Sequence, residues 1–183
     1  MTRSPVTPAL AELAAAARPG PAERDRARLL LADYLAVAGT GAGADSARVA
    51  RDALLPGSAG PAPVLGTGQT AAVRDAALVN GISAHSIELD DTHEPSSSHP
   101  GTVIWTALLA AAAGPPGGPV TTGAVLDSAV AGYQVMASLG ELLGPAELYR
   151  QGLHPTAVCG VFGATAAVAR LAGLDAAGVQ AAY

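Results

Sequence analysis

The chain of 183 residues contains no lysine, a single cysteine and few aromatic side chains. Its ten basic residues are all arginine, charged residues make up 14% of the sequence, and the formal net charge is −5. This sparse, slightly acidic composition argues against a nucleic-acid-binding protein, because phosphate backbones are bound by clustered Lys and Arg. The absence of lysine also removes one of the common catalytic acids and bases.

Long apolar runs and paired cysteines are lacking as well. The longest uninterrupted apolar runs, 107–114 and 157–164, fall well short of the ~20 residues that cross a bilayer. The first twenty residues contain three prolines and a glutamate, unlike a secretory signal peptide. Cys159 alone cannot form an intramolecular disulfide and fits a reducing compartment. We therefore expect a soluble, cytoplasmic protein with no membrane partner.

Small apolar side chains in helical patterns dominate what is present. Hydrophobic residues make up 50% of the chain. Residues 61–70 look extended, with Val64 and Leu65 as the one strand-like pair, and 115–119 is expected to be a turn. With no convincing strand ladder, repeat or linker, we predict an all-α single domain over 1–183. Pro and Gly punctuation delimits the predicted helices, which we place at 8–17, 22–37, 45–55, 70–87, 100–113, 122–143 and 155–173.

Titratable residues crowd into one stretch, HSIELDDTHEPSSSHP at 85–100. It contains three of the four histidines and four of the fifteen acidic residues. A helix that reaches residue 88 puts His85 and Glu88 on one face. His99 directly precedes a proline at the start of the next helix, near the positive end of its dipole. Imidazoles, carboxylates and a threonine hydroxyl beside a helix N-terminus suit general acid–base chemistry on an anionic substrate.

A second His-Pro pair begins the helix at 155–173 with His154. The glycines of this helix, Gly160 and Gly163, each lower helix propensity by roughly 1 kcal/mol relative to Ala. Close helix packing or close approach of a substrate explains them, and for Gly163 we favour packing. Cys159 has no activating neighbour in the sequence and is interpreted as a small buried residue rather than a nucleophile.

The crowded residues also have structural interpretations. His85 lies in an otherwise apolar helix, where a hydrogen-bonded structural histidine is an alternative to a catalyst. Asp90 and Asp91 can cap or fix the loop, and His93 can simply be exposed. Three histidines with acids nearby invite a metal site, but their spacings of eight and six residues match no HExxH or paired-ligand zinc pattern. We therefore predict no metal.

Three blocks of the sequence resemble blocks of the MmgE/PrpD family in the same order, from about residue 8 to 183. The family's core pattern reads roughly NG…H…DFDDTH…HP, and the matching blocks here are ALVNGISAHSIELDDTHEPSSSHPGTVIWTALLAAA, AGYQVMASLG and GLHPTAVCGVFGATAAVARLAGLD. The resemblance implies a large helical domain, an α+β lid domain and dimerisation. It also implies dehydration, decarboxylation, epimerisation or a related isomerisation of small polycarboxylates, without metal or organic cofactor.

The resemblance also implies roles for individual side chains. The positions that correspond to catalytic residues are His99, His154, Thr92 and Glu88. The positions expected to bind substrate are His85, Asp90, Asp91 and His93. Two departures put the substrate in question: Glu88 stands where the family usually has Asp, and the loop between Thr92 and His99 is one residue longer than in the decarboxylase-type pattern.

The chain is less than half as long as the family implies, and it contains no lysine to replace the family's later active-site lysines. A helical pattern that begins at Asp175 ends within about nine residues, which is marginal unless it packs on something. We therefore expect the N-terminal portion of the helical domain, truncated and without the lid, and a second polypeptide that carries the rest. On this interpretation the chain is a subunit of a split, cofactor-independent lyase or isomerase with a small carboxylate substrate, in a specialised biosynthetic pathway. The alternative is a non-catalytic binding or scaffold subunit derived from the same family.

Overall fold

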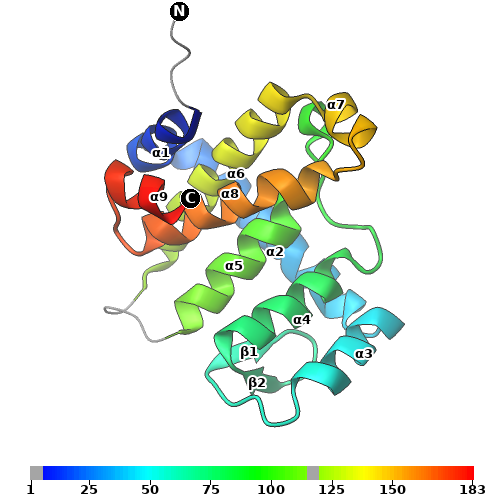
Figure 1. The fold of residues 1–183 in the computed structure, drawn as a ribbon. Helices are drawn as coiled ribbons and strands as arrows, with labels where there is room; N and C mark the ends of the chain where they lie inside the picture. The colour runs from blue at the N-terminus through cyan, green and yellow to red at the C-terminus, as the bar shows by residue number, and fades with distance from the viewer. Residues whose placement is uncertain (1–5, 115–119) are drawn as a thin grey trace, which may run out of the picture.

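The computed structural model describes residues 6–114 and 120–183. Within these ranges the regular structure consists of nine α-helices, one short 3-10 helix and a two-stranded antiparallel sheet, so the predicted all-α class is confirmed (Figure 1). The elements in chain order are α1 (Val6–Ala16), α2 (Pro21–Gly41), α3 (Asp45–Leu54), β1 (Ala62–Val64), β2 (Gln69–Ala71), α4 (Val73–His85), η1 (Glu94–Ser96), α5 (Pro100–Ala113), α6 (Thr122–Leu143), α7 (Pro145–Arg150), α8 (Pro155–Leu171) and α9 (Ala176–Ala182).

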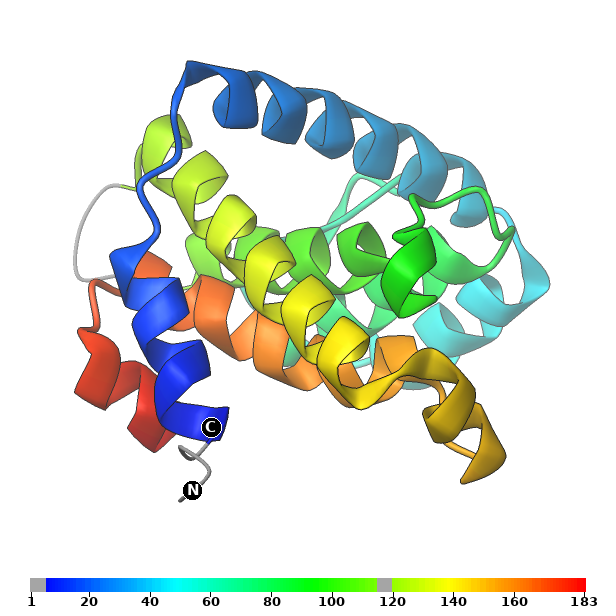
Figure 2. The same cartoon turned by 90° about the horizontal axis from the view of Figure 1, so that it is seen from above.

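Helices α5, α6 and α8 lie together at the centre of the molecule (Figures 1 and 2). Helix α2 crosses them on one side, α1 and α9 pack against each other near the termini, and α3, α4 and the hairpin form the opposite end. The largest fully buried side chains come from α5 and α6, and include Trp105, Ile104, Leu108, Leu126 and Met136. The core therefore sits where the three central helices meet.

Helices α6 and α8 approach each other at glycines. A Cβ atom at Gly163 would lie 2.7 Å from the Cβ of Met136 and 3.0 Å from the carbonyl oxygen of Gly132. A Cβ at Gly132 would lie 2.9 Å from the Cβ of Ala167. The packing interpretation of Gly163 is thus confirmed.

The region around residues 61–73 differs from the prediction. The helix predicted from residue 70 begins at Val73 instead, because residues 69–71 form a strand that pairs with β1, with Ala62 opposite Ala71. Each strand is only three residues long, too short to show an alternating pattern in the sequence. The prediction that the chain has no strand ladder was wrong for this hairpin.

Other differences are small. Helices α7 and η1 were not predicted, since six and three residues give too few turns for a periodic pattern. The helical pattern expected after Asp175 is confirmed as α9, and Asp175 Oδ1 accepts a hydrogen bond from the Gly178 N–H at 2.9 Å. The turn expected at 115–119 lies outside the described residues. Among the described helices, none is both long and apolar enough to pass through a bilayer.

Candidate active site

The N-termini of α5 and α8 are brought together by one threonine side chain. His99 and His154 occupy the positions before Pro100 and Pro155, which start the two helices. Proline suits the first helical position because its φ is preset and the N–H that it lacks has no partner there. The His99 N–H donates to Thr156 Oγ1 at 3.0 Å, and the Thr156 N–H donates to His154 Nδ1 at 3.2 Å. The two predicted catalytic imidazoles therefore belong to one neighbourhood.

The contact with the Thr156 N–H determines which nitrogen of His154 carries the proton. A backbone N–H can only donate, so Nδ1 of His154 accepts with its lone pair. In the neutral ring the proton is then on Nε2. His154 thus offers an Nε2–H donor at the N-terminal end of α8.

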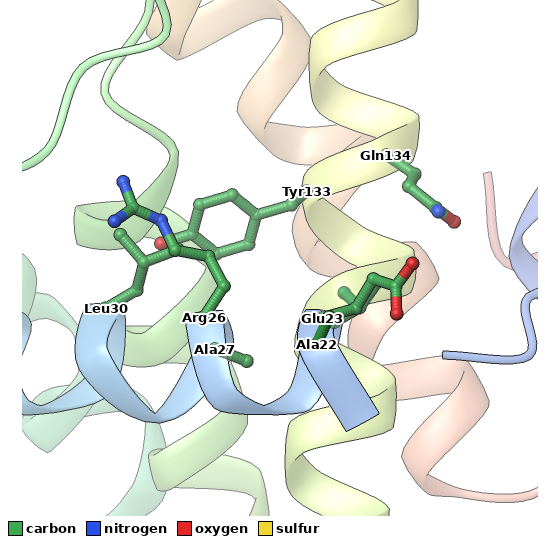
Figure 3. A pocket seen from close by; sticks show the side chains of 8 residues that line it. Ala22, Glu23, Arg26, Ala27, Leu30, Tyr133 and Gln134 are labelled. Carbon is green, nitrogen blue, oxygen red and sulfur yellow. The ribbon is translucent and has the colours of Figure 1, made fainter. Parts of the chain in front are cut away.

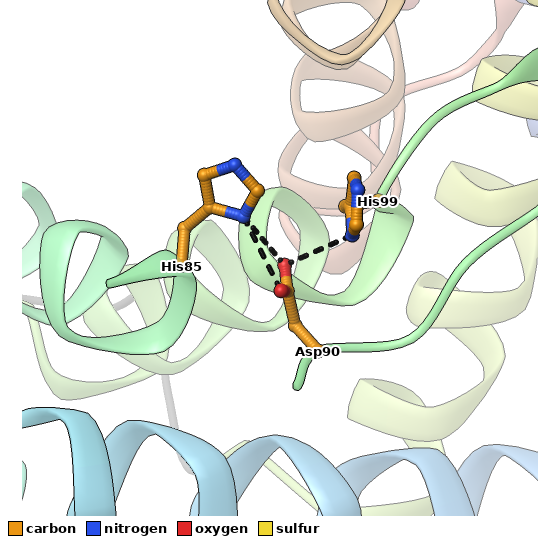
Figure 4. A group of neighbouring side chains, drawn as sticks. All are labelled: His85, Asp90 and His99. Carbon is orange, nitrogen blue, oxygen red and sulfur yellow. Dashed lines mark hydrogen bonds and ion pairs between the residues drawn. The ribbon is translucent and has the colours of Figure 1, made fainter. Parts of the chain in front are cut away.

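Asp90 lies between two other imidazoles (Figure 4). Its Oδ2 is 3.0 Å from Nδ1 of His85 and 3.4 Å from Nδ1 of His99, and its Oδ1 is 3.2 Å from Nδ1 of His85. The rings of His85 and His99 meet edge to face with centroids 4.9 Å apart. The Asp90 side chain is 2% exposed, against 37% for His85 and 20% for His99. A buried carboxylate thus faces two partly accessible imidazoles.

Glu88 reaches His85 by a route that the sequence did not predict. Helix α4 ends at His85, so the helical face expected to hold both residues does not exist. Glu88 instead adopts a left-handed conformation with φ of 52°, which is uncommon for a residue with a Cβ. Its carboxylate, 73% exposed, lies with Oε1 3.4 Å from Nε2 of His85. The predicted neighbourhood is therefore correct, although its helical explanation was wrong.

Asp91 faces away from the imidazoles, toward the protein interior. Its Oδ1 accepts a hydrogen bond from the Gly101 N–H and its Oδ2 from the Tyr133 hydroxyl, both at 2.7 Å. A Cβ at Gly101 would lie 2.6 Å from Asp91 Oδ1, so only glycine leaves room for this contact. Burial raises the pKa of Asp91 although both hydrogen bonds oppose the rise, and burial followed by the Asp91 charge raises the pKa of Tyr133. These contacts favour the loop-fixing interpretation of Asp91.

Thr92 and His93 lie outside this cluster of imidazoles. Thr92 is exposed, and no hydrogen bond links its side chain to another described residue. Nδ1 of His93 is 2.8 Å from Ser96 Oγ, and its Nε2 is 3.8 Å from a carboxylate oxygen of Glu141 on α6. His93 and Ser98 also form a β-bridge that closes the loop. The catalytic role of Thr92 and the substrate-binding roles of His93, Asp90 and Asp91 stay predictions.

A pocket of about 500 Å³ opens beside the imidazoles. Its polar wall consists of His85, His154 and Thr156, whereas His99 lies against His85 and outside the lining. None of the described residues that line it is an arginine, and the remaining wall is apolar, formed by Val103, Ala157, Gly160, Val161 and Ala164. The pocket thus has one hydrogen-bonding side and one hydrocarbon side.

Cys159, on the same helix as part of this wall, is fully buried. Burial raises the pKa of its thiol, so the sulfur is a poor nucleophile. This agrees with its interpretation as a packing residue.

A second pocket, of about 450 Å³, lies between α2 and α6 (Figure 3). Arg26, Ala27, Leu30 and Tyr133 are among its lining residues, and none of the lining residues within the described ranges is a histidine. Because the imidazoles face the other pocket, we place the candidate active site there.

His85, Asp90 and His99 also have the residue types of a metal site. Each offers one ligand atom, and these atoms lie within 4.8 Å of one another. Three protein ligands with open positions are typical of catalytic zinc. Sequence spacing did not reveal this grouping, because the loop from 86 to 98 brings distant residues together. The expected absence of metal stays a prediction.

Two residues of the site were not predicted. Thr156 connects both helix starts, and its place directly after a His-Pro pair was the available signal. Tyr133 supports Asp91 from α6, and nothing local in the sequence marks it, because its partner lies 42 positions away.

Comparisons with known proteins show which family the chain resembles. Residues 9–183 match the family model described as the MmgE/PrpD N-terminal domain. The human cis-aconitate decarboxylase is 34% identical over 103 residues, which cover 55% of this chain and 21% of that protein. The mouse cis-aconitate decarboxylase is 33% identical over 103 residues, with 55% and 20% covered. The aligned segment thus spans about a fifth of the length of these relatives.

Proposed function

The chain belongs to the MmgE/PrpD family, and from this premise we propose that it carries the imidazole-bearing part of a lyase or isomerase active site for a small carboxylate-bearing substrate. The supporting observation is that the imidazoles beside one pocket present opposite groups at Nε2: an N–H donor in one case and a lone-pair acceptor in the other. His154 accepts at Nδ1 and so offers an N–H at Nε2. His85 and His99 turn Nδ1 toward a carboxylate, which leaves lone pairs at Nε2. A proton donor, His154, and a proton acceptor, His85, thus line the pocket, and His99 packs against His85.

These groups are suited to proton transfer at a carbon next to a carboxylate. In a dehydration, His85, which lines the pocket and is supported by His99, takes the C–H proton, the electron pair forms the double bond, and the hydroxyl leaves as water with the proton of His154. In a decarboxylation, the C–C bond breaks, CO₂ leaves, and the carbon keeps the electron pair and takes the proton of His154. In an epimerisation, the proton leaves one face and returns to the other. None of these steps requires a metal or an organic cofactor.

Glu88 and Thr92 have supporting roles in this proposal. The exposed Glu88 carboxylate, 3.4 Å from Nε2 of His85, can exchange protons between that ring and solvent. Thr92, on the exposed loop, can donate a hydrogen bond from its hydroxyl to a carboxylate oxygen of the bound substrate.

The pocket favours a substrate with one carboxylate end and one hydrocarbon part. The N-terminus of α8 and the imidazoles attract the carboxylate, while Val103, Ala157 and Val161 contact the hydrocarbon part. Two relatives are named cis-aconitate decarboxylase, so decarboxylation of a small unsaturated carboxylic acid is the first reaction to test.

The substitution His154→Asn tests the proposal. Asparagine is a good N-cap residue, so its side-chain oxygen can still accept from the Thr156 N–H while the acid is lost. We expect turnover to fall by about 10²–10⁴-fold, the range typical of general acid–base catalysis, in steady-state assays of the assembled enzyme.

The matched control is Asp175→Asn, which changes the cap of α9 and should leave turnover unchanged. Full turnover in His154→Asn would contradict the acid assignment.

The alternative is a non-catalytic binding subunit of the same family. It is favoured by the absence of arginine from the described pocket lining, since a polycarboxylate would be held more firmly by guanidinium groups. Under this alternative, His154→Asn changes ligand affinity or assembly, and no turnover is found with any partner present.

We also propose a second polypeptide that covers the pocket. Val161, which lines the pocket, is 65% exposed, Leu89 beside the Asp90 loop is 68% exposed, and Leu153 beside His154 is 42% exposed. Exposed large apolar side chains on and next to site residues are typical of an interface. A partner there would exclude water from the imidazoles and supply the cationic groups that the described pocket lining lacks.

A further inference from the structure

Asp90 is the most buried ionisable side chain of the site, and it serves two imidazoles at once. Only 2% of its side chain is exposed. Both of its oxygens are within 3.2 Å of Nδ1 of His85, and Oδ2 is 3.4 Å from Nδ1 of His99. Nδ1 of His99 is buried and makes no hydrogen bond with any described residue, so the Asp90 carboxylate 3.4 Å away acts on it as a neighbouring negative charge. At Nδ1, both rings therefore face this one carboxylate, whereas Nε2 of His85 lies 3.4 Å from the carboxylate of Glu88.

We propose that Asp90 is a positioning residue that holds His85 and His99 in the tautomer with the proton on Nδ1. A carboxylate can only accept hydrogen bonds, so His85 must present an N–H at Nδ1, and the negative charge 3.4 Å from Nδ1 of His99 favours an N–H over a lone pair there. The lone pair of each neutral ring is then at Nε2; in His85 this nitrogen lies 3.4 Å from the Glu88 carboxylate, whose charge is screened by solvent because 73% of that side chain is exposed. The tautomer assignment stands on the geometry alone, and its catalytic consequence rests on the proposed function.

This role differs from the substrate-binding role that the sequence predicts for Asp90. At 2% exposure the carboxylate cannot contact a substrate in the pocket, and Asp90 is absent from the lining within the described residues. The neighbouring Asp91 is committed to Gly101 and Tyr133. The two adjacent aspartates thus have separate tasks: Asp91 fixes the start of α5, and Asp90 orients the rings.

The competing explanation is that the same side-chain atoms bind a divalent metal. A metal ion held by His85, Asp90 and His99 through the atoms that now face one another would require both Nδ1 atoms to be unprotonated. The two models therefore predict opposite tautomers at these rings, which makes them separable by one measurement.

Long-range ¹H–¹⁵N correlation spectra of the intact protein, labelled with ¹⁵N at histidine, distinguish Nδ1–H from Nε2–H rings. We expect His85 and His99 to carry the proton on Nδ1 and His154 to carry it on Nε2. Nε2–H signals from His85 or His99 in the unsubstituted protein would overturn the proposal, even if no variant could be purified.

The substitution Asp90→Asn gives the second measurement. The amide offers one acceptor and one N–H donor in place of two acceptors, so we expect at least one of the two rings to change to the Nε2–H tautomer. The control is Asp75→Asn, because Asp75 lies at the other end of α4, is 15% exposed and accepts from Ser58 Oγ at 2.6 Å. It should leave all tautomers unchanged. Retention of Nδ1–H at both rings in Asp90→Asn would also overturn the proposal.

Turnover and metal binding complete the test. Loss of the correct tautomer in a comparable Asp–His pair lowers kcat by about 10⁴-fold, so we expect a loss of about 10²–10⁴-fold in kcat with KM changed less. If the protein shows no turnover at all, the proposed function fails while the tautomer result still stands. Stoichiometric binding of zinc chloride that removes the Nδ1–H signals at micromolar concentration would overturn the positioning role in favour of a metal site.

Discussion

At the residue scale, a buried carboxylate can stabilise a structure only if its surroundings compensate for the loss of water. Asp91 has two such compensations, the Gly101 N–H at the start of α5 and the Tyr133 hydroxyl on α6. Burial nevertheless dominates, and the pKa of Asp91 is raised above its ordinary value of 3.8. The folded protein therefore binds the Asp91 proton more tightly than the unfolded chain does.

This difference predicts a pH dependence that Asp91→Asn removes. A raised folded-state pKa contributes stability below pH 3.8 that is lost as the pH rises through the folded-state value. We expect the free energy of unfolding of the protein, minus that of Asp91→Asn, to decrease as the pH increases across this window. Urea unfolding at a series of pH values measures it.

Asp127 provides a control of opposite sign. Its hydrogen bonds with Arg24, at 2.6 and 2.8 Å, lower the pKa of Asp127, so its contribution is present above pH 3.8 and lost as the pH falls through the folded-state value. The corresponding difference for Asp127→Asn should increase as the pH rises. Parallel pH profiles for the two variants would contradict both assignments.

At the scale of elements, the contact between α6 and α8 determines where the pocket wall stands. Each helix has a glycine where the two meet, Gly132 on α6 and Gly163 on α8. Helix α8 begins with His154 and contributes Ala157, Gly160, Val161 and Ala164 to the pocket. The spacing between these helices therefore affects the position of the imidazole as well as the stability of the core.

Gly163→Ala tests this contact. The new Cβ would lie 2.7 Å from Met136 Cβ, and overpacking of this kind costs about 1–3 kcal/mol. The gain in helix propensity is at most about 1 kcal/mol, so we expect a net loss of about 1 kcal/mol in the free energy of unfolding. Chemical denaturation measures the change.

The matched control is Gly39→Ala in the last turn of α2. No atom from elsewhere in the protein lies within 4 Å of its Cβ position, so the propensity gain should appear alone, as up to about 0.5–1 kcal/mol of added stability. Equal effects of the two substitutions would show that the α6–α8 contact tolerates a methyl group.

At the scale of the whole molecule, some exposed apolar side chains lie at or next to site residues, and others lie elsewhere on the surface. Val161 lines the imidazole pocket and is 65% exposed, and Leu89, next to Asp90 in the chain, is 68% exposed. Leu29 on α2 and Val49 on α3 are equally exposed, at 65% and 67%, and lie outside that pocket's lining. Each pair consists of one valine and one leucine of similar exposure. Substituting either pair therefore removes a similar amount of apolar surface, and only its location differs.

We expect the chain by itself to self-associate through the pocket side. The double substitution Val161→Gln and Leu89→Gln should shift it toward monomer in size-exclusion chromatography with light scattering, because it removes apolar surface that association would bury. The control pair Leu29→Gln and Val49→Gln should leave association unchanged. A monodisperse, cooperatively melting monomer of the unsubstituted chain would contradict the prediction.

Much of the helical framework follows from local sequence. Proline at the first position marks the starts of α5 and α8, and the cap residue Asp175 marks the start of α9. The His-Pro pairs by themselves predict that His99 and His154 lie at helix N-termini. The three-residue strands and the six-residue α7 were beyond this reasoning, because so few residues cannot display a period.

The sequence by itself determined the all-α class, the helix starts and the concentration of imidazoles and carboxylates, since these depend on spacing and capping within one segment. Only the tertiary structure decided that Asp90 faces His85 and His99 while Asp91 faces Gly101 and Tyr133. The two adjacent aspartates have the same side chain, so the sequence does not distinguish their roles. They acquire different tasks because α5 and α6, packed from distant parts of the chain, supply N–H and O–H donors to one and leave the other to the imidazoles.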